Sequence, residues 1–179
     1  LESLTKQFSE RISLIEKKIF DISNTNFNIG SPKQLGEVLF LHMKLPYGKK
    51  GKSGNFQTDV KILEKLKSEK IEIASLILDW RHFSKLKNTY CEGLLSRESK
   101  KTSRIHTSYG MASTLTGRLS SNDPNLQNIP IKTSEGRQIR KAFISDPNFQ
   151  IVSFDYSQIE LRILAHVANV NSLINAFSN

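Results

Sequence analysis

The stretch IVSFDYSQIELR, residues 151–162, decides the fold of this chain. Gln150 to Phe154 is a short β-prone run that follows the turn-forming residues 146–148. From Ser157 onward the apolar side chains return at intervals of three and four, which is helical spacing: Ile159, Ile163, Val167 and Val170. We therefore predict a strand that ends near Asp155 and a helix that begins directly after it.

Asp155 is the first candidate for chemistry. A strand end holds a carboxylate rigidly outside the core, and the next turn brings Gln158 and Glu160 near it. Such an arrangement suits a hard divalent cation, because Mg²⁺ prefers one or two carboxylates together with phosphate oxygens and water. The residues alone leave a second interpretation open, in which Asp155 caps the following helix.

A second unusual stretch, TGRLSSNDPNLQNIP, occupies residues 116–130 and has few apolar side chains to bury. It carries five long or amide-bearing polar residues: Arg118, Asn122, Asn125, Gln127 and Asn128. Donors of this kind suit the DNA minor groove, where acceptors lie at nearly the same places in every base pair. An Asx-rich surface turn is the alternative interpretation.

The sequence pattern of the first hundred residues predicts helices. Apolar side chains at helical spacing predict long helices over residues 1–24 and 71–95, and capping patterns predict short ones that begin at Ser31 and Thr58. The intervening stretch PYGKKGKSGN, residues 46–55, has no apolar periodicity and predicts a mobile basic loop. Further along, residues 139–144 form another β-prone run, and the boundary between the two parts is expected near residues 98–104.

The charge of the chain points to a polyanionic partner. Its 26 basic and 17 acidic residues give a net charge of +9 in 179 residues. The lone Cys91 favours a reducing compartment, and no apolar run has membrane-spanning length, so we expect neither secretion nor a membrane location. A first residue other than Met suggests an excised piece of a longer protein.

Both polar stretches, together with RHFSKLKNTY (81–90), RIHTSYG (104–110) and EGRQIRKAFI (135–144), resemble family A DNA polymerases, the class of bacterial DNA polymerase I. The resemblance implies an α+β fold with a helical thumb subdomain packed beside an incomplete antiparallel palm sheet. Residues 1–101 would form the thumb, with its basic tip loop near 46–55. Residues 102–179 would form the first part of the palm through motif A, and the fingers and the rest of the palm would lie outside this chain.

The resemblance also implies roles at the active site. Asp155 would be one of two catalytic aspartates and would bind two Mg²⁺ ions together with the Tyr156 carbonyl. Glu160 would pack under the sugar of the incoming nucleotide and exclude a 2′-hydroxyl, with Gln158 beside it.

Other positions match DNA contacts of the family. Arg118 would reach the minor groove at the primer terminus, and Asn125, Gln127 and Asn128 would contact the duplex. Lys132 stands where relatives carry arginine, so its phosphate contact would be a point charge in place of a bidentate fork. Lys85 and the tip lysines Lys49, Lys50 and Lys52 would follow the DNA backbone.

The parent that the resemblance implies is a monomeric enzyme that acts on primer-template DNA and dNTPs, while the 179-residue chain alone is expected to be inactive. The resemblance also implies a location in the bacterial cytoplasm, at the nucleoid, with an organelle as the alternative. The alternative is a stand-alone module that grips duplex DNA without catalysis. An RNA-binding accessory protein is a third possibility, but it would need a preference for A-form duplexes that no residue here specifies.

Overall fold

The computed structural model describes residues 1–52 and 54–178, and it divides the chain into two compact units, Leu1–Phe143 and Ile144–Asn179. The helical elements of the first unit are α1 (Glu2–Ser23), α2 (Pro32–Glu37), the π-helical η1 (Val38–His42), α3 (Val60–Ser68), α4 (Glu72–Lys85), the π-helical η2 (Leu86–Glu92), α5 (Gly93–Leu95) and α6 (Ser134–Arg140). Its strands are β1 (Glu98–Ser99), β2 (Arg104–Ile105), β3 (Ser108–Gly110) and β4 (Ser120–Asn122). The second unit contains α7 (Ile159–Val167) and α8 (Asn171–Ser178).

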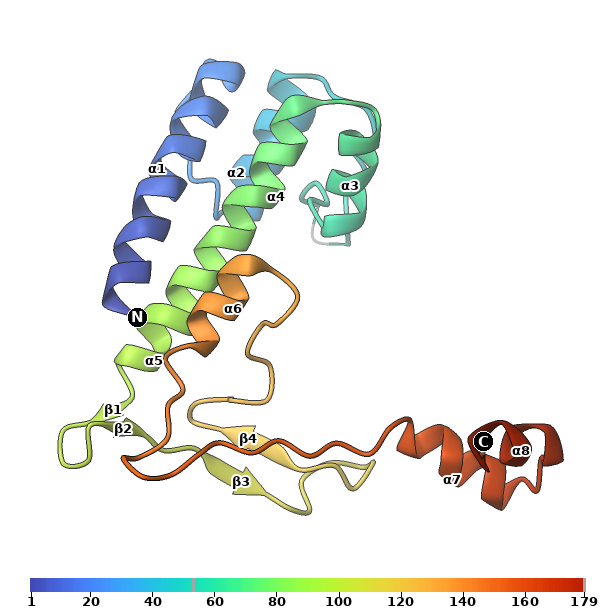
Figure 1. The fold of residues 1–179 in the computed structure, drawn as a ribbon. Coiled ribbons are helices and arrows are strands. Elements are labelled where there is room, and N and C mark those ends of the chain that lie inside the picture. The colour runs from blue at the N-terminus through green and yellow to red at the C-terminus, as the bar shows by residue number, and fades with distance from the viewer. Residues whose placement is uncertain (53, 179) are drawn as a thin grey trace. The chain divides into compact units, whose positions relative to one another are not determined.

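The two long helices expected from periodicity are present and lie side by side (Figure 1). Helix α1 ends at Ser23, and the left-handed conformation of the next residue, Asn24 (φ 49°), stops the helix where the sequence predicted its end. The second long helix runs without interruption through α4, η2 and α5. The expected short helix after Ser31 also forms, with the Ser31 side chain accepting a hydrogen bond from the Gln34 backbone.

Two hydrophobic clusters hold the first unit together, and both long helices contribute to each. The larger cluster joins α1, α3 and α4 and includes Ile19, Leu63 and Ile77. The smaller cluster comprises Phe8, Leu86, Tyr90, Cys91 and Ile139. Burial raises the pKa of the Cys91 thiol, which favours the unreactive protonated form.

Two small antiparallel sheets complete the first unit and confirm an α+β fold. Strand β1 pairs with β2, and β3 pairs with β4 in a register that places Tyr109 opposite Ser121. None of the helices in residues 1–52 and 54–178 combines the length and the apolar content needed to cross a membrane.

Both predicted strands outside these sheets are wrong. Residues 139 and 140 end helix α6, because Thr133 caps that helix and Ile139 is buried in the smaller cluster. Residues 150–154 lie outside any strand, and across the described residues no pairing involves them. A β-prone run needs a partner strand, and its sequence alone does not supply one.

Helix α3 begins one residue later than predicted. Asp59 is its cap, with Oδ1 accepting a hydrogen bond from the Ile62 backbone at 3.0 Å. Thr58, the expected cap, is buried and accepts two hydrogen bonds from Arg81 of α4.

Candidate functional site

The segment that carries Asp155 leads directly into helix α7 of the second unit. Asp155 and Tyr156 are exposed, and Gln158 occupies the N-cap position with a left-handed backbone (φ 53°, ψ 41°). Gln158 and not Asp155 is the N-cap residue of α7, so the interpretation of Asp155 as the cap of this helix is wrong. Glu160 lies in the first turn of α7, where a negative charge is favoured by the helix dipole.

Arg162 braces this segment, a role that sequence reasoning missed. Its Nε donates to the Ser157 carbonyl at 2.9 Å, and its NH1 donates to the Phe177 carbonyl at 3.2 Å. The guanidinium also lies 4.8 Å from the centre of the Phe177 ring. Arg162 therefore ties the turn after Tyr156 to α8, and its place in the DYSQIELR motif was the available signal.

Hard oxygen donors are the metal-binding chemistry that this segment offers. The Asp155 carboxylate and the Tyr156 carbonyl are both of the class that Mg²⁺ prefers, so the residues present fit that ion as part of a ligand set. Across residues 1–52 and 54–178, no group of three His, Cys, Asp or Glu residues could hold a metal by itself.

The predicted DNA-contacting residues of the stretch 116–130 lie on one segment of the first unit. We call residues 118–128 the donor loop. Arg118, Asn125, Gln127 and Asn128 are all exposed on it. Two of these side chains also make internal hydrogen bonds: Asn125 Oδ1 accepts from the Gln127 backbone at 2.9 Å, and Gln127 Nε2 donates to the Leu119 carbonyl at 2.8 Å.

A buried hydroxyl organises the middle of the donor loop. Ser121 is 1% exposed, and its Oγ accepts a hydrogen bond from the Leu126 backbone at 3.0 Å. Thr107 Oγ1 lies 2.7 Å from Ser121 Oγ and 2.8 Å from the Pro124 carbonyl oxygen. Most of the donor loop lacks regular secondary structure, and these hydrogen bonds give it a defined shape.

The end of the donor loop is fastened to the helices around it. The Tyr90 hydroxyl of η2 donates to the Asn128 carbonyl at 3.0 Å, and Ile129 packs against the smaller hydrophobic cluster. A Cβ atom on Gly136 of α6 would lie 2.9 Å from Pro130, so only glycine allows this close approach. Sequence reasoning did not identify Tyr90 or Gly136 because their partners are distant in the chain.

The lysines predicted to meet phosphates are exposed. Lys85 ends helix α4, and Lys132 lies just before the cap of α6. In the tip loop, the described residues form a narrow turn in which the Gln57 backbone donates to the Lys49 carbonyl at 2.9 Å. Lys50 lies 5.3 Å from the centre of the Phe56 ring, and residue 53 of this loop is outside the described residues.

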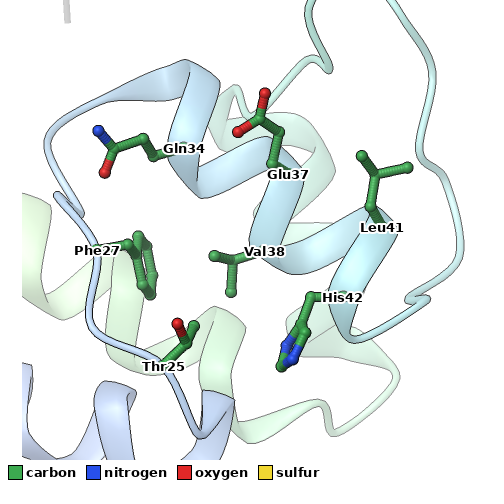
Figure 2. A pocket seen from close by; sticks show the side chains of 7 residues that line it. All are labelled: Thr25, Phe27, Gln34, Glu37, Val38, Leu41 and His42. Atoms are coloured by element: carbon green, nitrogen blue, oxygen red, sulfur yellow. The ribbon is translucent and has the colours of Figure 1, made fainter.

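A separate cavity of about 500 Å³ lies between the α1–α2 connection and η1 (Figure 2). It is lined by Thr25, Phe27, Gln34, Glu37, Val38, Leu41 and His42. Gln34 is already engaged there, because its Oε1 accepts a hydrogen bond from the Asn28 backbone at 2.8 Å. None of the residues predicted from the sequence as site residues lines this cavity.

The family model of DNA polymerase family A matches residues 1–179. This chain therefore belongs to DNA polymerase family A.

Individual relatives agree with the family. The chain is 49% identical to DNA polymerase I of Rhizobium leguminosarum over 179 residues, covering 100% of this chain and 18% of the relative. It is 48% identical to DNA polymerase I of Geobacillus stearothermophilus over 178 residues, covering 99% of this chain and 20% of the relative. The chain thus spans about a fifth of the length of these curated relatives.

A solved structure shares the fold. The POL domain of Pol1 from M. smegmatis, in complex with DNA primer-template and dNTP, superposes with a TM-score of 0.87 at 38% sequence identity. That match covers 99% of this chain and 31% of the other chain.

Proposed function

We propose that this chain is part of a longer DNA-directed DNA polymerase, called here the parent polymerase. The parent transfers nucleotides from dNTPs to a primer 3′-hydroxyl under the direction of a template strand. Residues 1–101 serve as its thumb, and residues 102–179 serve as the first part of its palm through motif A. The match of the whole chain to the polymerase family carries this proposal, and the M. smegmatis relative bound to primer-template and dNTP supports it.

Asp155 is the proposed catalytic residue. Its exposed carboxylate, with the Tyr156 carbonyl, would hold two Mg²⁺ ions together with acidic ligands from the rest of the parent. Two bound Mg²⁺ ions supply Lewis-acid activation of the primer 3′-hydroxyl and stabilisation of the pyrophosphate leaving group. Arg162 holds the turn at Ser157, so it keeps the Asp155 segment in one conformation relative to α7 and α8.

Gln158 and Glu160 form the proposed nucleotide-binding pair. Both follow Asp155 within five residues, so the same turn that presents the carboxylate also presents them to the incoming dNTP. Glu160 excludes a 2′-hydroxyl from the sugar site.

The donor loop and the lysines form the proposed DNA interface. Arg118, Asn125, Gln127 and Asn128 donate hydrogen bonds to minor-groove acceptors, which report base-pair geometry without reading sequence. Lys132, Lys85 and the tip lysines Lys49, Lys50 and Lys52 neutralise phosphates. Their exposure supports this role, since each side chain is open to a large ligand.

We place the parent in the bacterial cytoplasm, at the nucleoid, because its bacterial relatives are named DNA polymerase I and its proposed partner is duplex DNA. We propose that the parent acts as a monomer.

Primer extension by the parent polymerase tests the proposal. Asp155→Asn keeps the size of the side chain and removes its charge, so we expect extension to fall by about 100-fold or more, because metal-ion stabilisation is worth several kcal/mol. The matched control is Asp146→Asn, a similarly exposed aspartate in the preceding turn, which should leave extension unchanged. DNA binding without any extension by the unmodified parent would instead favour the non-catalytic binding module.

A further inference from the structure

Tyr90 lies in η2, a turn of helix that is wider than an α-helical turn. Because π-helical bonds join residues five apart, Leu86, Tyr90 and Cys91 can all face the same side. All three are buried, and Tyr90 is 5% exposed. The ring therefore packs in the smaller hydrophobic cluster while its hydroxyl reaches the edge of that cluster.

The hydroxyl of Tyr90 meets the backbone of the donor loop. It donates to the Asn128 carbonyl at 3.0 Å, across 38 residues of sequence. This bond is partly buried, and losing the hydroxyl would remove its contribution to holding the Asn128 carbonyl in place. It joins the last residue of the donor loop to a helix of the core.

Neighbouring contacts hold the same end of the loop. Ile129 packs against the cluster that contains Tyr90, and Arg140 NH1 lies 3.4 Å from the Ile129 carbonyl oxygen as its donor. Pro130 is in close contact with Gly136. The chain from Asn128 to Pro130 is thus fixed, while the donor side chains before it are exposed.

The same helix carries a proposed phosphate contact. Lys85 is the last residue of α4, five residues before Tyr90, and no break separates the two in the helix. The distance between this lysine and the minor-groove donors therefore depends on one continuous helix and on the contacts of residues 128–130, among which the Tyr90 hydrogen bond is the one that joins the loop backbone to that helix.

We infer that Tyr90 is a positioning residue, whose hydroxyl sets the donor loop against the thumb helix so that its donors meet the minor groove at the primer end. The inference rests on the proposed polymerase function. Donors held in place form hydrogen bonds with the minor-groove acceptors of a correctly paired primer terminus. A mismatched terminus presents its acceptors at other positions, so the same donors stabilise it less. Losing the hydroxyl should therefore slow matched extension more than mismatched extension.

The test is Tyr90→Phe in the parent polymerase, which keeps the ring and removes only the hydroxyl. We expect the ratio of matched to mismatched primer extension to fall by about 3- to 10-fold, the size that one neutral hydrogen bond accounts for. The control is Ser23→Ala, which removes a hydroxyl that is also buried and donates to a backbone carbonyl, that of Thr25 at 3.1 Å, but has no contact with the donor loop, so it should leave the ratio unchanged. An unchanged ratio in Tyr90→Phe would overturn the inference.

Two further variants separate positioning from stability. Ile73→Val removes a methyl group from the larger cluster and lowers stability without touching the donor loop. If it lowers the ratio as much as Tyr90→Phe does, the inference is wrong.

Ile129→Val loosens the fixed end of the donor loop, so it should also lower the ratio of matched to mismatched extension, even if Tyr90→Phe folds poorly. The unmodified parent is assayed first. If it does not extend a primer, the proposed function itself is wrong, and this outcome is distinct from any difference between variants.

Discussion

At the scale of single residues, Gln158 determines how the segment that carries Asp155 turns into a helix. Its left-handed backbone lies in the turn that follows Tyr156, and α7 starts at the next residue. Glu160 is therefore the second residue of α7, in its first turn, five residues after Asp155. One unusual backbone conformation thus places the proposed nucleotide-binding carboxylate.

Glu160→Ala in the parent polymerase tests the proposed exclusion of the 2′-hydroxyl. We expect the preference for deoxynucleotides over ribonucleotides to fall by about 10- to 200-fold, the range that one added group in a tight pocket accounts for. Competing incorporation of dNTP and rNTP on the same primer-template measures the ratio.

Glu135→Ala is a matched control, since Glu135 also occupies the second position of a helix, α6. A hydrogen bond from its own backbone lowers the pKa of Glu135, so this change likewise removes a negative charge from a helix N-terminus. The control should affect both sugars alike. Equal losses for both sugars in Glu160→Ala would contradict the exclusion and indicate a structural role for Glu160.

Single residues also mark where prediction from sequence reached its limit. Asp155 and Glu160 could be singled out because they follow an apolar run at fixed spacing. Tyr90 and Arg162 could not be given their roles, because each acts through a carbonyl of a residue that only the folded chain brings near. Asp59 displaced Thr58 as a cap since Thr58 is held by Arg81, a contact that crosses 23 residues.

At the scale of elements, the tip loop presents positive charge from a narrow, hydrogen-bonded turn. Lys49, Lys50 and Lys52 are exposed there, and the cation–π contact of Lys50 with Phe56 leaves its charge in place. If these lysines neutralise phosphates, each lost contact should reduce the magnitude of the slope of log K against log salt by about 0.9.

The measurement is duplex binding by the parent polymerase over a series of salt concentrations, with all three tip lysines changed to alanine. The control variant changes three exposed lysines of α1, Lys6, Lys17 and Lys18, and so removes the same charge elsewhere in the first unit. We expect a smaller slope in the tip variant than in the control. Identical slopes in the tip variant and the unmodified protein would remove the tip from the DNA interface.

Helices could be predicted well and strands poorly, for a physical reason. The apolar spacing of α1 and of residues 72–95 specifies a buried face that any neighbouring helix can cover. The runs at 139–144 and 150–154 have β-prone residues, but pairing depends on a partner that the run does not encode. In the first case the Thr133 cap and the buried Ile139 favoured a helix instead.

At the scale of the whole molecule, the second unit leaves much of its apolar surface uncovered. Val152 is 65% exposed, Phe154 92% and Val167 76%. Units below about 40 residues rarely bury enough surface to be stable alone, and residues 144–179 are such a unit. We therefore expect the isolated 179-residue polypeptide to self-associate.

The isolated polypeptide should also bind primer-template weakly and add no nucleotides. Two-metal catalysis needs acidic ligands on both sides of the reacting phosphorus, and the described residues offer Asp155 with a single carbonyl beside it. Primer extension at saturating Mg²⁺ and dNTP measures the activity, and light scattering over a concentration series measures association. Extension that disappears in Asp155→Ala would contradict this expectation, whereas extension that survives the change would come from a contaminating polymerase.

The wide turn of η2 bears on how this chain tolerates changes in length. A π-helical bond spans one residue more than an α-helical bond, so η2 accommodates an additional residue between α4 and α5. Deleting one residue from 86–92 would let this turn form a regular α-helix, and the side chains of the flanking turns would keep their faces. Deleting one residue inside α4 would instead rotate all later side chains of the helix by about 100° about its axis. Among homologous chains, single-residue insertions and deletions in the second long helix should therefore gather at η2, and those that remove Tyr90 from the buried face should be rare.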